Sequence, residues 1–239
     1  MERQKRIELI DGARGLSIIL MIFYHFFYDL AVFCAFPSWI VYNPLFNFLQ
    51  PVFAGLFILM SGASAMFSRS NVKRGLKMLA GGLVISLVTW LFDPSLFVRF
   101  GILHFMGVAA LLFAALRPLI TKIPYQQYLW PVLFFLCYFA LNRTFDVKYL
   151  AFLGFRSPGY ASSDYFPVLP WIFVYFMGTW LGARIKAGRM PQWFYETRAP
   201  FFAAVGRHTL WIYLLHQPIL MGLTYLIRYF QSVSAVFFF

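Results

Sequence analysis

Long apolar segments alternate with short polar breaks along the whole chain. A helix needs about 20 mostly apolar residues to cross the hydrocarbon core of a bilayer, and the breaks between these segments carry proline, charge or both. Seven segments fit, at residues 13–35, 45–67, 75–92, 97–116, 127–142, 166–185 and 208–230. The pattern predicts an all-α polytopic membrane protein, a bundle of about seven transmembrane helices that forms a single domain over residues 1–239.

Composition supports this prediction. Hydrophobic residues make up 62% of the chain and charged residues 12%, whereas soluble domains are roughly half apolar and a quarter charged. An ordinary soluble protein is therefore excluded. The N-terminal MERQKR before an apolar run is similar to a secretory signal, but no A-x-A-like cleavage site follows, so we expect an uncleaved anchor.

The net charge of +12 could indicate a nucleic-acid partner, so the placement of the basic residues matters. With the N-terminus in the cytoplasm, fifteen of the 20 Lys and Arg residues fall on the inner side. The other five are Arg99, Arg143, Lys148, Arg156 and Arg228. Such an asymmetry is typical of membrane topology and of attraction to anionic lipid headgroups. We therefore expect a lipid bilayer and no nucleic acid as partner.

Two ionisable residues lie within the first apolar segment, where each costs about 2.5–3.5 kcal/mol to insert. His25 and Asp29 are four residues apart, which places them on one face of a helix. If the helix leaves the inner surface near Gly15, His25 lies about 15 Å deep and Asp29 about 21 Å deep. In the fourth segment, His104 lies about 10 Å below the outer surface, at the level of Asp29. Asp29 could orient His25 or pair with Arg99.

The seventh segment adds a polar pair at a proline. His216 and Gln217 lie about 12 Å from the inner surface, and Pro218 removes a backbone N–H directly after them. A single histidine in a membrane helix serves as often to form an interhelical hydrogen bond as to carry out a function. Polar groups on three helices at overlapping depth instead favour a shared wet cavity. Small residues such as Gly62 and Gly82 indicate close helix packing, and the isolated Cys34 and Cys137 predict packing and no metal site.

Acyl transfer is the chemistry that this set of side chains allows. A histidine can take a proton from a hydroxyl or amine, and a neighbouring carboxylate can fix its tautomer. Alternatively, the imidazole itself could carry the acyl group. No Gly-rich phosphate loop of Walker or Rossmann form is present.

Five motifs give the chain a family resemblance. They are RIELIDGARGLSIILMIFYHFFYDL, FAGLFILMSGAS, RFGILHFMGVAALL, YFPVLPWIFVYFMGTWLG and GRHTLWIYLLHQPIL. In this order they resemble the bacterial family related to the catalytic domain of heparan-α-glucosaminide N-acetyltransferase (domain of unknown function 1624). The D-x-x-R-G element with a histidine about ten residues later is also similar to the wider transmembrane acyltransferase superfamily.

The resemblance implies a bacterial inner-membrane enzyme that moves an acyl group, most simply acetyl from acetyl-CoA in the cytoplasm, to a glycan or other hydroxyl or amine acceptor outside. His25 matches the superfamily's histidine, and Asp11 and Arg14 match its N-terminal motif. The expected roles are as follows: catalysis by His25, Asp29 and His104; contact with the CoA donor by Asp11, Arg14, Lys73, Arg74 and Arg207; contact with the acceptor by Arg99, Asp164, His216 and Gln217.

Three alternatives stay open at this stage. The same His and Asp residues suit a proton relay in a small-molecule or proton-coupled transporter, and a non-catalytic helper that docks a membrane partner would also fit. The animal enzyme has more membrane segments than the seven counted here, so a homodimer or a different donor site is a further expectation. A retinal-type receptor is excluded because the seventh segment has no lysine.

Overall fold

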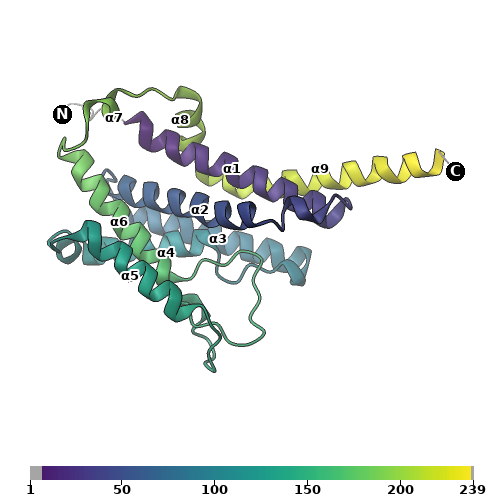
Figure 1. The fold of residues 1–239 in the computed structure, drawn as a ribbon, viewed down its shortest axis with the longest axis horizontal. Helices are drawn as coiled ribbons and strands as arrows, with labels where there is room; N and C mark the ends of the chain where they lie inside the picture. The colour runs from purple at the N-terminus through teal and green to yellow at the C-terminus, as the bar shows by residue number, and fades with distance from the viewer. Residues whose placement is uncertain (1–6, 238–239) are drawn as a thin grey trace. The chain divides into compact units, whose positions relative to one another are not determined.

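The computed structural model describes residues 7–237, and these residues form an all-helical structure without a named strand (Figure 1). Seven long helices correspond to the seven predicted segments, which confirms the all-α prediction. They are α1 (Glu8–Phe33), α2 (Pro44–Ala65), α3 (Asn71–Phe92), α4 (Ile102–Ile120), α5 (Gln126–Leu141), α6 (Val168–Lys186) and α9 (Thr209–Phe237). The short elements are η1 (Ser38–Ile40), η2 (Pro94–Leu96), η3 (Ala151–Leu153), α7 (Gln192–Glu196) and α8 (Pro200–Arg207).

Six of the described helices are long and apolar enough to cross a bilayer, and the chain is an integral membrane protein. The remaining long helix, α5, has 16 residues and is shorter than a usual span. The seventh crossing and the cytoplasmic N-terminus therefore stay predictions. Arg3, Lys5 and Arg6, which contribute to the predicted inner charge, lie outside the described residues.

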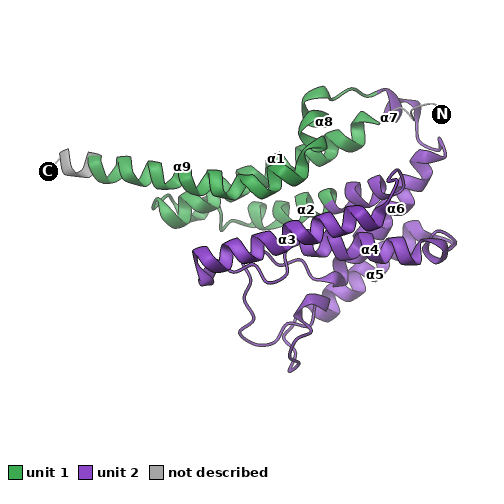
Figure 2. Ribbon diagram, turned by 180° about the vertical axis from the view of Figure 1, so that it is seen from behind, with its two compact units in different colours: residues 1–57, 197–239 green, residues 58–196 purple. Residues whose placement is uncertain are grey.

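The chain divides into two compact units (Figure 2). Unit 1 consists of Met1–Phe57 and Thr197–Phe239, and unit 2 is Ile58–Glu196. Unit 1 is thus built from both ends of the chain, and the boundary falls inside α2. The sequence-based division into one domain stays a prediction.

In unit 1, α1 lies beside α8 and α9 (Figures 1 and 2). Hydrogen bonds join Arg14 to Gly206, Asp29 to Gln217 and Cys34 to Thr224, and the sequence separation of each pair stays between 188 and 192 residues. A constant separation means that the two segments run parallel. Side chains about one helical turn apart on α1 therefore meet side chains about one turn apart on the partner segment.

In unit 2, α3 lies beside α4, and α5 beside α6. The C-terminal part of α2 approaches α6 so closely that a Cβ atom added to Gly62 would overlap the Tyr175 carbonyl, and one added to Gly178 would overlap the Leu59 carbonyl. Small residues permit such backbone contact between membrane helices. The packing role predicted for Gly62 is confirmed.

The start of α4 differs from the prediction. We expected the fourth helix to begin at residue 97, but α4 begins at Ile102. Residues 97–101 are extended and pair with the segment before α6, through bonds from Phe166 N–H to Phe100 O (3.1 Å) and from Ser163 N–H to Phe97 O (3.4 Å). His104 consequently lies in the first turn of α4 and not about two turns into the helix, as the predicted start at residue 97 implied.

Candidate functional site

Two imidazoles meet where α1 packs against α9. The ring centroids of His25 and His216 are 5.3 Å apart. His216 is buried, and its Nδ1 lies 2.6 Å from the Tyr213 carbonyl oxygen. Because a carbonyl can only accept, Nδ1 of His216 carries the proton and donates it. The other nitrogen, Nε2, is buried and has no hydrogen-bond partner within the described residues. The backbone thus fixes a tautomer that leaves a lone pair on Nε2.

One turn further along α1, a buried carboxylate is held by an amide. Gln217 donates its Nε2–H groups to both oxygens of Asp29, at 3.2 and 2.9 Å. Asp29 is 2% exposed and has no cation partner in the part of the chain that the structure describes. The Gln217 carbonyl oxygen is also buried without a partner among those residues. The hydrogen-bond partner of Asp29 found among the described residues is therefore the Gln217 amide, and the predicted orientation of His25 by Asp29 stays a prediction.

The D-x-x-R-G element joins α1 to α8. Arg14 forms an ion pair with Asp11 at 2.8 Å and donates to the Gly206 carbonyl at 2.5 Å. Gly15 and Gly206 bring the two backbones together, since a Cβ on Gly15 would overlap the Phe202 carbonyl oxygen and one on Gly206 the Asp11 carbonyl oxygen. These contacts give Asp11 and Arg14 a clear role in packing, next to the donor contact expected from the sequence.

The other basic residues expected to contact the donor differ in exposure. Arg74 donates through Nη2 to the Ser61 carbonyl oxygen at 3.0 Å and to the Ser61 hydroxyl, which ties α3 to α2 within unit 2. Lys73 and Arg207 are exposed. Lys73 and Arg207 can therefore reach a solvent-borne anion directly, whereas Arg74 already has internal acceptors.

His104 has partners for both ring nitrogens inside unit 2. Its Nδ1 accepts the Gly101 N–H at 3.2 Å, so Nε2 carries the proton and faces the Ser86 hydroxyl at 3.3 Å. Ser86 in turn donates to the Val98 carbonyl at 2.6 Å. The ring also lies against Gly82, where an added Cβ would be 3.0 Å from it. A histidine satisfied on every side fits a structural role at the start of α4 better than proton transfer.

Asp164 caps α4 from a distant part of the chain. Its Oδ2 accepts the Ile102 N–H at 2.9 Å, and Gly101 leaves room for the carboxylate, since a Cβ there would overlap it. An aspartate in this position satisfies one of the helix's free N–H groups. The contact places Asp164 beside the segment that carries Arg99 and gives it a structural bond, while its predicted contact with the acceptor stays a prediction.

We expect Asp164→Ala to destabilise unit 2 by about 1 kcal/mol, the usual cost of a lost cap. For a chain of this size, Tm measured in detergent should fall by roughly 2–4 °C. Asp146→Ala is the matched control, because Asp146 is exposed in the loop before α6 and has no partner within the described residues. Equal Tm values for the two variants would contradict the capping role.

A cavity that the sequence analysis did not identify lies at the ends of α4, α5 and α6. It measures about 310 Å³ and is lined by Arg184, Arg189, Thr121, Thr179, Gln126 and Trp180, with two alanines. Arg184 also stacks over the Trp180 ring at 5.5 Å. From the sequence, both arginines counted only as positive-inside charge. The two arginines cluster because three helix ends meet there, and no local sequence pattern predicts this meeting.

A family model matches most of the chain. The family model described as "Heparan-alpha-glucosaminide N-acetyltransferase, catalytic" matches residues 6–218 of the chain. The matched range includes His25, Asp29, His216 and Gln217, and it covers residues of both units. No curated protein and no solved structure matches the chain. The family resemblance stated from the five sequence motifs is confirmed.

Proposed function

Because the chain belongs to the heparan-α-glucosaminide N-acetyltransferase catalytic family, a family of membrane acetyltransferase-like proteins, we propose that it transfers an acyl group, most simply acetyl, from acyl-CoA to a hydroxyl or amine of a glycan acceptor. We place the donor on the cytoplasmic side of a bacterial inner membrane and the acceptor on the outer side. The observation that carries the proposal is the contact between His25 and His216 inside unit 1.

In the proposed reaction, His25 accepts the proton of the acceptor's hydroxyl or amine as that group attacks the thioester carbonyl. The C–S bond then breaks, the acyl group is left on the acceptor, and the CoA sulfur leaves as a thiolate that takes up the proton. His216 lies next to His25 with a fixed lone pair on Nε2. His216 can take the proton from His25 before it passes to the thiolate, which makes His216 part of the reacting pair. In the variant mechanism, His25 itself carries the acyl group between donor and acceptor.

Asp29 and Gln217 suit the orientation of the acceptor. A buried carboxylate without a cationic partner is costly, and a hydroxyl or amine of the acceptor could donate to Asp29 and satisfy it. The unpartnered carbonyl oxygen of Gln217 offers a second acceptor for the same ligand. We propose these two side chains as contacts of the sugar hydroxyls or amine rather than as helpers of His25.

For the donor phosphates we propose, within unit 2, the arginine-lined cavity of Arg184 and Arg189 and the exposed Lys73. The exposed Arg207 of unit 1 is proposed as a separate phosphate contact. Guanidinium groups bind phosphate in a bidentate way and are the usual choice for this task. Arg14 and Arg74 donate to backbone carbonyls, so we assign Arg14 to holding α1 against α8 in unit 1 and Arg74 to holding α3 against α2 in unit 2.

The test uses the full chain in proteoliposomes with acetyl-CoA inside and a mixture of mono- and oligosaccharides outside. We expect release of free CoA, measured by liquid chromatography, and one acetylated sugar in the outer medium, identified by mass spectrometry. Empty liposomes are the control. Uptake of a sugar in the absence of any acyl-CoA, with no acetylated product, would instead identify a transporter and overturn the proposal.

A further inference from the structure

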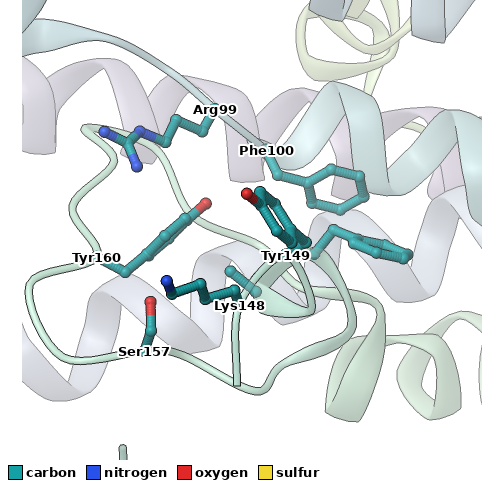
Figure 3. Close-up of a pocket in the computed structure, with 8 residues that line it drawn as sticks. Arg99, Phe100, Lys148, Tyr149, Ser157 and Tyr160 are labelled. Atoms are coloured by element: carbon teal, nitrogen blue, oxygen red, sulfur yellow. The ribbon is translucent and has the colours of Figure 1, made fainter. Parts of the chain in front are cut away.

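A second cavity lies in unit 2, where the loop before α6 folds over the start of α4 (Figure 3). It measures about 380 Å³. Two cations, Arg99 and Lys148, and two tyrosines, Tyr149 and Tyr160, line it together with Phe100 and Phe152. In the view of Figure 3 the Tyr160 ring lies between the Arg99 guanidinium and the Lys148 amine. The cavity thus combines positive charge with aromatic faces.

Specific hydrogen bonds hold the walls of this cavity in place. The Arg99 N–H donates to the Ser162 hydroxyl at 3.0 Å, and the pairing of Phe100 with Phe166 continues this contact. The Tyr165 hydroxyl donates to the Ala151 carbonyl at 2.7 Å and so fastens the turn that carries Phe152. The loop is therefore anchored on both sides of the cavity, and its lining is preformed in the way typical of ligand sites.

The two cations keep their charge available for a ligand. The ion pairs found among the described residues are Arg14 with Asp11 and Arg198 with Glu8, both in unit 1, and neither involves Arg99 or Lys148. Arg99 instead lies over the Tyr160 ring, 5.4 Å from its centroid, a geometry that orients a cation without neutralising it. Burial raises the pKa of Tyr160 above its ordinary value, against the opposing effect of Arg99, so the phenol remains a hydrogen-bond donor at neutral pH.

The ligand class follows from this lining. A guanidinium and an ammonium in the lining favour a carboxylate or a phosphate. Tyr149 is 91% exposed and offers a free aromatic face for the apolar face of a sugar ring. A volume of about 380 Å³ lies at the small end of ligand pockets, which run from about 300 to 1,000 Å³. We propose that this cavity binds one saccharide residue that carries a carboxylate or a phosphate.

This inference rests on the proposed function in one respect: it takes the ligand of the cavity to be a saccharide. Arg99 belongs to the acceptor residues expected from the sequence, whereas Lys148, Tyr149 and Tyr160 are new. All three lie in the loop before α6 or at its edge. Binding of the sugar to this cavity can be measured without any donor, so its outcome does not depend on acyl transfer.

The experiment is a calorimetric titration of the detergent-purified full chain with glucuronate, glucose 1-phosphate and glucose, in buffer free of phosphate. We expect one acidic sugar to bind at least ten times more tightly than glucose. The double variant Arg99→Gln/Lys148→Gln should lose at least ten-fold in affinity for that sugar, and Lys148→Gln alone, at an exposed position, should lose about three-fold or more. Arg143→Gln is the matched control, because Arg143 lies in the same loop outside the cavity, over the Phe145 ring at 5.0 Å, and should bind as the wild type does.

Three results would overturn the inference. They are equal affinity for glucose and both acidic sugars, unchanged affinity in the double variant, and inorganic phosphate that binds as tightly as glucose 1-phosphate. Displacement of the sugar by phosphatidylglycerol added to the micelles would assign the cavity to a lipid headgroup and overturn it as well. Acidic-sugar binding together with a failed liposome assay would retain this site and reject the acyl transfer.

Discussion

Replacing His216 by alanine is expected to lower the rate of acyl transfer by about 10²–10⁴-fold, the range over which a positioned acid or base contributes to catalysis. The reason is the fixed tautomer: Nδ1–H donates a hydrogen bond to the Tyr213 carbonyl, so Nε2 is left as a base beside His25. His25→Ala should lose a similar factor. Because the two imidazoles act as a unit, the double variant should be hardly slower than either single variant. The measurement is the initial rate of CoA release under saturating acetyl-CoA, with Tm recorded for each variant.

The control for this pair is His208→Ala. His208 is exposed between α8 and α9 in the same unit. Because substitutions at exposed positions usually have small effects, His208→Ala should transfer the acyl group at a rate within about two-fold of wild type. His104→Ala should behave in a third way, lowering Tm because the Gly101 N–H loses its acceptor, at a cost of about 1–3 kcal/mol. Wild-type rates in both His25→Ala and His216→Ala would remove the central assignment of the site.

The largest expected effect on stability comes from Gly15→Ala. A Cβ at this position would overlap the Phe202 carbonyl oxygen and lie 2.9 Å from the Gly206 backbone nitrogen. Backbone atoms in two packed helices cannot rotate away as a side chain can, so the helices must separate. Overpacking of this kind costs about 1–3 kcal/mol, which corresponds to a fall in Tm of roughly 2–12 °C. Gly206→Ala should cost as much, because its Cβ would overlap the Asp11 carbonyl oxygen.

Gly222→Ala provides the matched comparison. Gly222 lies in α9 of the same unit, and an added Cβ there meets no atom within 4 Å. In a helix interior alanine is favoured over glycine by about 0.5–1 kcal/mol, so Tm should stay the same or rise. If Gly15→Ala and Gly222→Ala melted at the same temperature in a thermal scan in detergent, the close contact between α1 and α8 would be refuted.

Apolar pattern alone predicts the helices well, because a bilayer leaves few other ways to satisfy the backbone. The same logic singled out His25, Asp29, His216 and Gln217 as costly residues at overlapping depth, and the structure brings them together within unit 1. The partners within the group could not be predicted. The i, i+4 spacing favours contact between His25 and Asp29, but the amide of a parallel neighbouring helix reaches both carboxylate oxygens.

The residues around α4 show where sequence reasoning fails. Apolar composition continues through residues 97–101, and this led to a helix start five residues too early. Two contacts fix the start of α4 after Gly101: the pairing of residues 97–100 with residues more than 60 positions away, and the bond to the carboxylate of Asp164. Neither contact leaves a local signal in the sequence. The cavity lined by Arg99 and Lys148 has the same origin. Its aromatic and basic residues are visible in the loop, but their convergence depends on the Tyr165 hydroxyl and the Ala151 carbonyl.

The assembly of unit 1 from both ends of the chain has a consequence for biosynthesis. α1 leaves the ribosome first, yet its partners α8 and α9 follow only after about 190 further residues, as the separation of 190 between Cys34 and Thr224 shows. Until then Asp29 has no Gln217 to hold it, and Gly15 faces no helix. Contacts so distant in sequence form late and slowly. α1 must therefore remain in the membrane with Asp29 uncovered until α9 has been made, and the two histidines can meet only after translation has passed residue 216.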